Sequence, residues 1–145
     1  MGQYYVIANL DKRQYLSPHS FGSGLKLMEF SSDGESIMQA VAILLADGNN
    51  RGGGDLRTHH PLVGSWAGDR IVVAGDYADD GKFCDGEVGD EGQKLNLHSV
   101  ARTQYEDISD SVIRVIVEAE GSQSRMSKLN LDKEYRWSIQ LDIPD

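Results

Sequence analysis

A glycine-rich segment is the first place where the chain could do chemistry. Residues 47–56 read DGNNRGGGDL and set three consecutive glycines between Arg51 and Asp55. Glycine costs chain entropy, but it lets a ligand or another backbone come close to the amide groups. Phosphate-binding loops place their glycines before a helix, whereas here a predicted helix precedes them. The order therefore favours a helix-to-strand connection, and a ligand-binding loop is the alternative.

The next turn carries side chains that would complement such a loop. Within residues 65–70, SWAGDR, Trp66 could stack a base, and Asp69 could act as a general base or hold a cation. Because the glycines lead into the predicted hairpin that contains this turn, we expect Arg51 and Asp55 to lie near Trp66 and Asp69 at one end of the sheet. Packing of Trp66 in the core is the competing interpretation. The candidate ligand-binding residues are Asn49, Arg51, Gly53, Asp55, Trp66, Asp69 and Arg70.

An acidic segment follows at residues 76–92, with seven carboxylates and one lysine. When the twelve-residue calcium loop is laid over it, Asp76 takes the first position, Asp80 the fifth and Glu87 the bidentate twelfth. Ala78 stands at the third position, which wants an oxygen ligand, and the flanks are not two helices. The segment therefore favours a solvated acidic loop, with weak calcium binding by Asp76, Asp80 and Glu87 as the alternative, and we expect no obligatory cofactor.

The histidines and the cysteine do not fall into a catalytic or metal-binding pattern. His59 and His60 are adjacent and would point to opposite faces of a strand, and His19 and His98 are isolated in the sequence. Cys84 is the single cysteine and lies among carboxylates, which raise the pKa of a thiol. No zinc-ligand spacing and no nucleophile elbow occurs. Whether the protein is an enzyme stays open, and the pattern leans against it.

Charge narrows the classes of partner. The 145 residues include 14 Lys and Arg against 23 Asp and Glu, a net charge of −9. This balance argues against direct binding to a phosphate backbone and suits a partner with a basic surface. The chain has no apolar run of the roughly 20 residues that span a bilayer, and its first residues lack a signal-peptide pattern. We expect no membrane partner and a cytoplasmic protein, for which the single cysteine is also typical.

Periodicity predicts a single α+β domain over residues 1–145, with an antiparallel sheet covered by two main helices. Its best helix covers residues 31–48, with a capping box at Ser32 and Glu35. A second helix is predicted within residues 96–121 from apolar spacing after Ile108, although its β-branched density also fits a buried strand. The predicted strands cover residues 3–10, 13–16, 24–30, 61–66, 70–77 and 135–143.

Four stretches together resemble a set of small, uncharacterised proteins of bacteria and their phages. They read MGQYYVIANLDKRQYLSPH, FGSGLKLMEF, GNNRGGGDL and LVGSWAGDRIVVAGDY. The resemblance covers about the first 80 residues of the chain. It implies the cytoplasm of a bacterial cell or of a phage-infected host, and no activity.

Two functions from different classes are compatible with these observations. The first is a non-enzymatic interaction protein whose acidic surface engages a basic protein partner. The second is a protein that handles a nucleotide or another small anionic molecule, with a hydrolase among its forms. Its site would lie where residues 48–55 meet the turn at 65–70.

Overall fold

The computed structural model describes residues 2–32, 36–84, 89 and 91–121. The strand predicted at 135–143 lies outside these residues. The strands are β1 (Tyr5–Asn9), β2 (Gln14–Leu16), β3 (Ile71–Gly75) and β4 (Glu106–Asp107). The helices are α1 (Leu27–Phe30), α2 (Ile37–Leu45), α3 (Leu97–Gln104) and α4 (Ser109–Glu120), with a 3-10 helix η1 (Pro18–Phe21).

The strands form one sheet in the order β3-β1-β2-β4, which confirms the predicted α+β fold. The central strand β1 pairs antiparallel with both neighbours, so that Ile7 lies opposite Leu16 on β2 and Val73 on β3. The hairpin predicted from residues 3–10 and 13–16 is confirmed. The short β4 pairs parallel with β2, which makes the sheet mixed.

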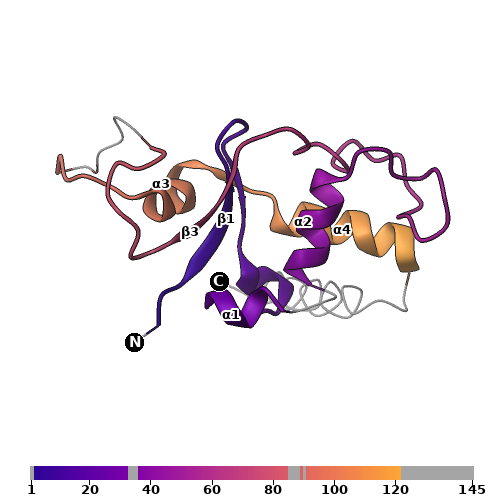
Figure 1. Cartoon of the computed structure of the whole chain (residues 1–145), viewed down its shortest axis with the longest axis horizontal. Helices are drawn as coiled ribbons and strands as arrows, with labels where there is room; N and C mark the ends of the chain where they lie inside the picture. Colours follow the sequence, from indigo (N-terminus) through magenta and orange to yellow (C-terminus); the bar gives the residue numbers. More distant parts are fainter. Residues whose placement is uncertain (1, 33–35, 85–88, 90, 122–145) are drawn as a thin grey trace, which may run out of the picture.

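Helices cover both faces of this sheet, as Figure 1 shows. Ile7 joins one core with Trp66 and with buried residues of α2 and α4. Val6 and Ala8, its neighbours along the strand, join a second core with α3. Successive side chains of a strand point to opposite faces, so β1 is buried on both. This accounts for its nearly continuous apolar sequence, YVIAN.

Two of the predicted strands are wrong. Within 24–30 the chain forms the single helical turn α1, which starts where the backbone N–H of Lys26 donates to Glu29 Oε1 at 3.1 Å. Residues 61–66 form turns, because Gly64 and Trp66 donate their backbone N–H groups to Ile43 and Leu44 at the end of α2. The strand predicted at 70–77 is confirmed as β3, but it pairs with β1.

Gly64 shows why residues 61–66 turn. Its φ is +77°, and a Cβ there would lie 2.5 Å from the carbonyl oxygen of Ala46. Only glycine combines this backbone conformation with so close an approach. The segment therefore closes the end of α2, and the hairpin predicted from 61–66 and 70–77 does not form.

The predicted helices are present with changed limits. The helix α2 starts at Ile37 after Ser36, not after the predicted cap Ser32, and Glu35 of that capping box lies outside the described residues. The helix α4 confirms the helical interpretation of the β-branched segment. A separate helix, α3, precedes it and was not predicted. No helix within the described residues has the length and apolarity to cross a membrane.

Candidate functional site

In the glycine-rich segment, backbone N–H groups donate hydrogen bonds to the carboxylate of Asp55, which belongs to the same segment. Asp55 Oδ2 accepts hydrogen bonds from the backbone N–H groups of Arg51 at 2.9 Å and Gly52 at 3.1 Å. These backbone donors hold the pKa of Asp55 below its ordinary value, because they stabilise the charged carboxylate. Two of the backbone amides that a phosphate could use are therefore already occupied.

Asn49 completes this closure. Its amide group donates to the carbonyl oxygen of Leu56 at 2.7 Å, and its Oδ1 accepts the backbone N–H of Leu56 at 2.9 Å. Of the three glycines, Gly54 has a φ of +88°, whereas a Cβ on Gly53 would meet nothing within 4 Å. The segment is thus a structured connection, as the order of elements favours, and it requires glycine for its backbone conformation at Gly54.

The structure places Trp66 in the core, which corrects its prediction as a base-stacking residue. The side chain is 0% exposed, and its indole Nε1 donates to Gln14 Oε1 at 2.9 Å. A ring enclosed in this way offers no face to a ligand. The competing interpretation of Trp66, ordinary core packing, is the one that the burial supports.

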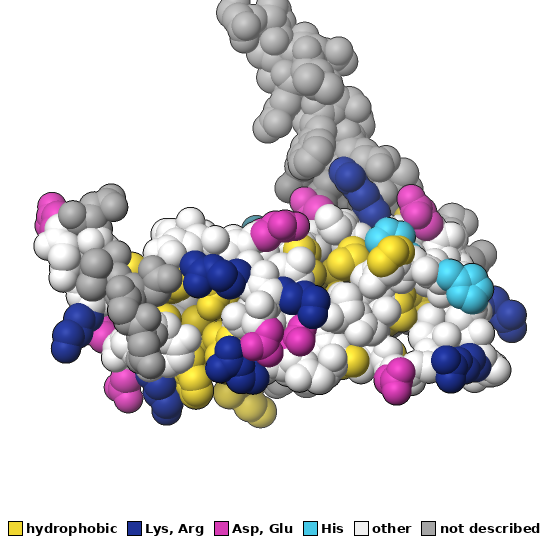
Figure 2. Space-filling view, turned by 90° about the horizontal axis from the view of Figure 1, so that it is seen from above, with side chains coloured by type: hydrophobic (Ala, Val, Ile, Leu, Met, Phe, Trp, Pro, Cys, Tyr) yellow, Lys and Arg dark blue, Asp and Glu magenta, His cyan; other side chains and the backbone are white. Residues whose placement is uncertain are grey.

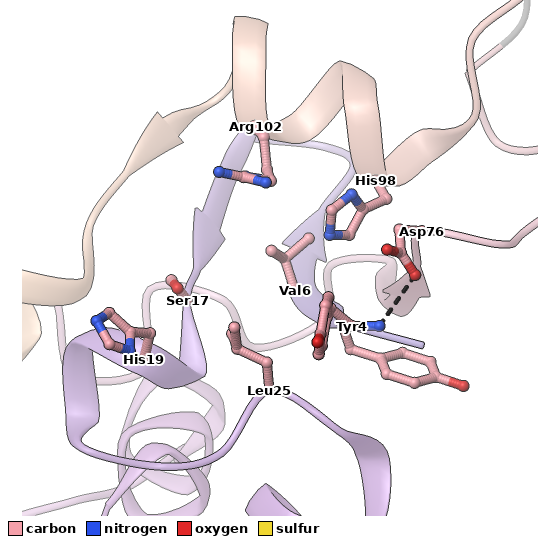
Figure 3. A pocket seen from close by; sticks show the side chains of 9 residues that line it. Tyr4, Val6, Ser17, His19, Leu25, Asp76, His98 and Arg102 are labelled. Carbon is pink, nitrogen blue, oxygen red and sulfur yellow. Dashed lines mark hydrogen bonds between the residues drawn. The ribbon is translucent and has the colours of Figure 1, made fainter. Parts of the chain in front are cut away.

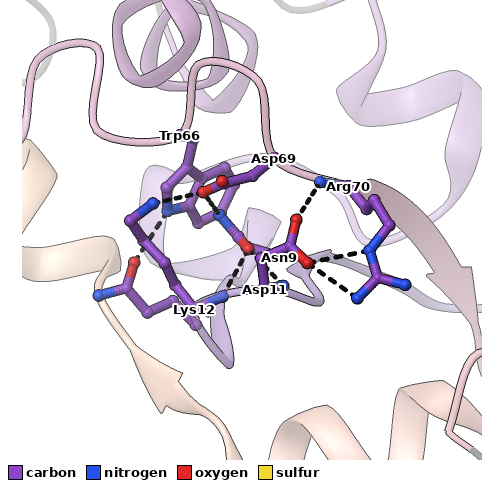
Figure 4. A network of polar contacts seen from close by, with 7 residues as sticks. Asn9, Asp11, Lys12, Trp66, Asp69 and Arg70 are labelled. Atoms are coloured by element: carbon purple, nitrogen blue, oxygen red, sulfur yellow. Dashed lines mark hydrogen bonds and ion pairs between the residues drawn. The ribbon is translucent and has the colours of Figure 1, made fainter.

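Asp69 and Arg70 attach this turn to the β1–β2 hairpin (Figure 4). Asp69 Oδ2 accepts from the Asn9 amide at 2.9 Å and pairs with Lys12. The Arg70 guanidinium Nε donates to Asp11 Oδ1 at 2.9 Å. The pKa values of both carboxyls are lowered by these hydrogen bonds, from Asn9 and Lys12 in Asp69 and from the Arg70 backbone and side chain in Asp11. Asp69 pairs with Lys12 and Arg70 pairs with Asp11, so these side chains are engaged in fixing the turn to the hairpin. We call these two ion pairs the clasp.

The predicted ligand-binding residues therefore fall into two groups. Within the described part of the chain, no hydrogen bond or ion pair joins the glycine-rich segment to Trp66, Asp69 or Arg70. Arg51 instead lines a cavity of about 240 Å³ with His59 and His60. Both imidazoles there are engaged locally, His59 with the Asn50 amide and His60 Nδ1 with the backbone N–H of Leu62. A single ligand-binding site formed by these two segments stays a prediction.

The acidic segment is described only in part, and calcium binding stays a prediction because Glu87 lies outside the described residues. Asp80 is exposed, whereas Asp76 Oδ1 accepts the backbone N–H of Tyr4 at 2.9 Å. Among the described residues no three His, Cys, Asp or Glu side chains gather as metal ligands would. Cys84 is buried, and its Sγ donates to the carbonyl oxygen of Leu95.

A different cavity brings together side chains that are far apart in the sequence. It encloses about 220 Å³ between β1, the segment around η1 and α3, and we call it the His98 cavity (Figure 3). Its lining consists of Tyr4, Tyr5, Val6, Ser17, His19, Leu25, Asp76, His98 and Arg102. Pockets of drug-like ligands usually hold roughly 300–1,000 Å³, so this cavity suits a smaller molecule.

Local structure explains how the polar groups of the cavity are positioned. His98 and Arg102 stand four residues apart on α3, which puts both side chains on one face of the helix. Asn96 caps this helix by accepting the backbone N–H of Ser99, and its amide donates to the carbonyl oxygen of Asp76 at 2.9 Å. One residue thus holds the start of α3 against the segment that carries Asp76.

His98 lies between two opposite charges. In Figure 3 its ring stands between the Arg102 guanidinium and the Asp76 carboxylate. Burial lowers the pKa of His98 most strongly, Asp76 acts in the opposite direction, and Arg102 lowers the pKa further. The imidazole is therefore kept neutral at pH 7, with one nitrogen able to donate and the other able to accept a hydrogen bond.

His98 is 7% exposed as a residue and its ring makes no hydrogen bond among the described residues, but its nitrogens are not sealed off, because Ser65 Oγ is the one fully buried side-chain polar atom without a partner in that part of the chain. Apolar groups line the neighbouring wall, where the Leu25 and Val6 side chains point into the cavity (Figure 3). A buried polar group usually has a protein or water partner. The arrangement is that of a small binding site: an apolar wall, a neutral hydrogen-bonding ring, and a charge on each side.

Sequence reasoning treated His98 as an isolated histidine and missed this site. The one available signal was the spacing of His98 and Arg102, which becomes informative only if α3 is recognised as a helix. Asp76 was singled out, but for calcium.

No protein-family model, no curated protein and no solved structure matches this chain. The resemblance noted for the first part of the sequence stays a prediction.

Proposed function

We propose that the protein binds a small molecule in the His98 cavity. The ligand carries an anionic group, which pairs with Arg102, and a cationic or hydrogen-bond-donating group at its other end, which pairs with Asp76. The observation that carries this proposal is the His98 ring, which lines the cavity between these two charges and makes no hydrogen bond among the described residues. A ligand atom on the ring would offset the cost of burying it.

The charges of the cavity set the class of ligand. A polyanion is disfavoured, because the Asp76 carboxylate would repel it. A cation alone would meet the Arg102 guanidinium. A zwitterion, such as a free amino acid, or a small acid with an amide or hydroxyl group satisfies both ends. This departs from the phosphate-bearing ligand expected at the glycine-rich segment.

A thermal-shift screen tests the proposal on the full chain with free amino acids, small hydroxy acids, nucleotides and inorganic phosphate as probes. A ligand at about 100 times its dissociation constant adds roughly 2.7 kcal/mol, which raises the melting temperature by several degrees. We expect a zwitterion or small hydroxy acid to give this rise, and His98→Gln and Arg102→Ala to remove it. Arg51→Ala, outside the cavity, is the matched control and keeps the rise. Stabilisation only by nucleotides or phosphate, lost in Arg51→Ala, would contradict the proposal.

A second candidate function is binding to a basic protein partner, in the cytoplasm of a bacterial cell or a phage-infected host. The net charge of −9 and the exposed Asp79, Asp80 and Glu91 favour it. Such a surface attracts basic partners by long-range electrostatics, and added salt screens this attraction. Pull-down from host lysate tests it: we expect basic proteins to be retained at low salt and released at high salt, and retention of acidic proteins would count against it.

A further inference from the structure

Among the described residues, β3 has a strand partner on one edge only. It pairs with β1 on one side, and it is the terminal strand of the order β3-β1-β2-β4. Edge strands present unpaired backbone donors and acceptors, which can pair with another extended chain. Figure 1 shows β3 beside β1.

The register shows which groups point outward. Backbone bonds from Asp76 to Tyr4 and from Leu10 to Arg70 mark the bonded pairs at the two ends of the β1–β3 ladder. Since bonded and non-bonded pairs alternate in an antiparallel ladder, Val72 and Ala74 face β1. Ile71 and Val73 therefore direct their backbone N–H and C=O groups away from the sheet, and these groups have no partner among the described residues.

A groove of about 270 Å³ runs beside this edge. Its apolar lining comes from Val72 and Ala74 on the face of β3 that α3 covers, from Leu97 and from Phe83, with Val73 at the strand edge, and Asp79 and Lys82 also line it. Val73 is 45% and Phe83 53% exposed, although both are large hydrophobic residues. On the face in Figure 2, hydrophobic side chains gather toward the end of the molecule that holds β3 and α3, among charged ones.

Phe83 is held in an unfavourable conformation. Its φ is +63°, in the left-handed region that bulky residues rarely adopt. Residues held in this way cluster at ligand clamps and other functional sites. The surrounding structure therefore fixes this exposed aromatic side chain beside the groove in spite of the strain.

We propose that the edge of β3 binds an extended segment of a partner protein, with basic residues flanking an apolar residue that enters the groove. The backbone of that segment pairs with Ile71 and Val73 and extends the sheet. The basic residues meet Asp79 and Asp80, two exposed carboxylates against the one cation Lys82 in the described segment beside the edge. The inference rests on the second candidate function, for which it names the surface, and it is independent of the His98 cavity.

Charge argues against a second copy of this chain at the same edge. A second copy of this chain carries the same net charge of −9, so it would be repelled by an edge that is already flanked by Asp79 and Asp80. A segment with alternating basic and apolar residues has the opposite charge and the right periodicity.

The test uses full-length protein and a labelled synthetic peptide of alternating lysine and valine, with a glutamate–valine peptide as the charge control. We expect fluorescence anisotropy to show binding of the lysine peptide alone. Val73→Pro removes the outward N–H at an edge position, where proline is tolerated, and should weaken binding about tenfold or more. Val73→Thr keeps the N–H and is the matched control, with affinity near that of the wild type.

Phe83→Gly removes the apolar wall while relieving the backbone strain, so loss of peptide binding at an unchanged melting temperature reports on the wall itself. Hydrogen exchange reports on the edge itself: the Val73 amide should exchange quickly in the free monomer and become protected when the lysine peptide binds. Three results would overturn the proposal: no binding, equal binding by wild type and both edge variants, or a Val73 amide already protected in the free protein. Protection that rises with protein concentration would assign the edge to a second copy, and concentration-independent protection to the chain itself. If the lysine peptide does not bind but the protein still captures basic proteins at low salt, the edge of β3 is rejected as the binding surface, whereas the second candidate function stands.

Discussion

The Asp55 carboxylate accepts the backbone N–H of Arg51 at 2.9 Å and so closes the glycine-rich segment on itself. Glycine-rich loops bind anions through converging amides, and here the anion is supplied from within the loop. The most conspicuous segment of the sequence is therefore a structural connection. The proposed binding site lies instead at His98, whose neighbours in the cavity come from other parts of the chain.

The glycines of this connection should differ in their tolerance of alanine. Gly54→Ala should destabilise the protein by about 1–2 kcal/mol, because its φ of +88° is strained for any residue with a Cβ. Gly53→Ala should be neutral or stabilising by up to about 1 kcal/mol, because alanine restricts the unfolded chain and meets nothing in the fold. Urea unfolding of the two variants checks this. Equal losses of stability would show that the described loop conformation is wrong.

The bond between Trp66 and Gln14 should be measurable as a coupling. Gln14→Leu leaves the indole N–H without its acceptor, which costs about 1–3 kcal/mol when a buried donor is left unpaired. In Trp66→Phe the donor is gone, so the same Gln14→Leu change should cost much less. A double-mutant cycle by chemical unfolding measures the difference. Additive effects of the two substitutions would exclude this bond.

Acid should weaken the clasp on the β1–β2 hairpin. The folded-state pKa of Asp69 lies below its ordinary value of 3.8, because Asn9 and Lys12 stabilise the carboxylate. The unfolded chain then binds the proton more readily, so this stabilisation is complete above 3.8 and is lost as the pH falls through the folded-state pKa. Melting temperatures across acid pH should fall less steeply in Asp69→Asn than in wild type. Asp80→Asn, an exposed carboxylate elsewhere, is the control and should keep the wild-type slope.

His98 should give a second pH dependence, nearer neutrality. Its folded-state pKa is lowered from the ordinary 6.5, chiefly by burial. The unfolded chain therefore takes up the proton first as the pH falls, and stability decreases from about pH 6.5 until the folded-state pKa is passed. His98→Gln should remove this part of the slope. An unchanged slope in this variant would mean that His98 is not buried as described.

Local patterns were sufficient to predict much of the fold. The aromatic and β-branched residues of β1, the apolar face of α2 and the spacing in α4 are properties of neighbouring residues. The segment 61–66 resembled a strand because its apolar residues do enter the core, but its amides bind the end of α2, which no local pattern reports. The short helix α3 was missed because it has few apolar residues, although Asn96 is a residue type that commonly caps the start of a helix.

The binding site could not be predicted for a related reason. His98, Asp76 and Ser17 lie on three separate segments, and only the packing of α3 against β1 brings them to one cavity. Burial changes the character of His98, and burial is a property of the folded chain. By contrast, Arg51 and Asp55 were conspicuous because they are close in the sequence. The same closeness lets the Asp55 carboxylate accept the backbone N–H of Arg51 within the loop.

The titration of the His98 imidazole by NMR tests the central proposal most directly. It is measured in the free protein and in the protein saturated with the compound selected by thermal shift. We expect a pKa below 6.5 in the free protein, and an increase on binding, because an anionic group beside the ring stabilises its charged form. The resonances of His59 and His60, next to the glycine-rich segment, should keep their positions. An unchanged His98 titration together with shifted His59 and His60 resonances would place the ligand at the glycine-rich segment and contradict the account.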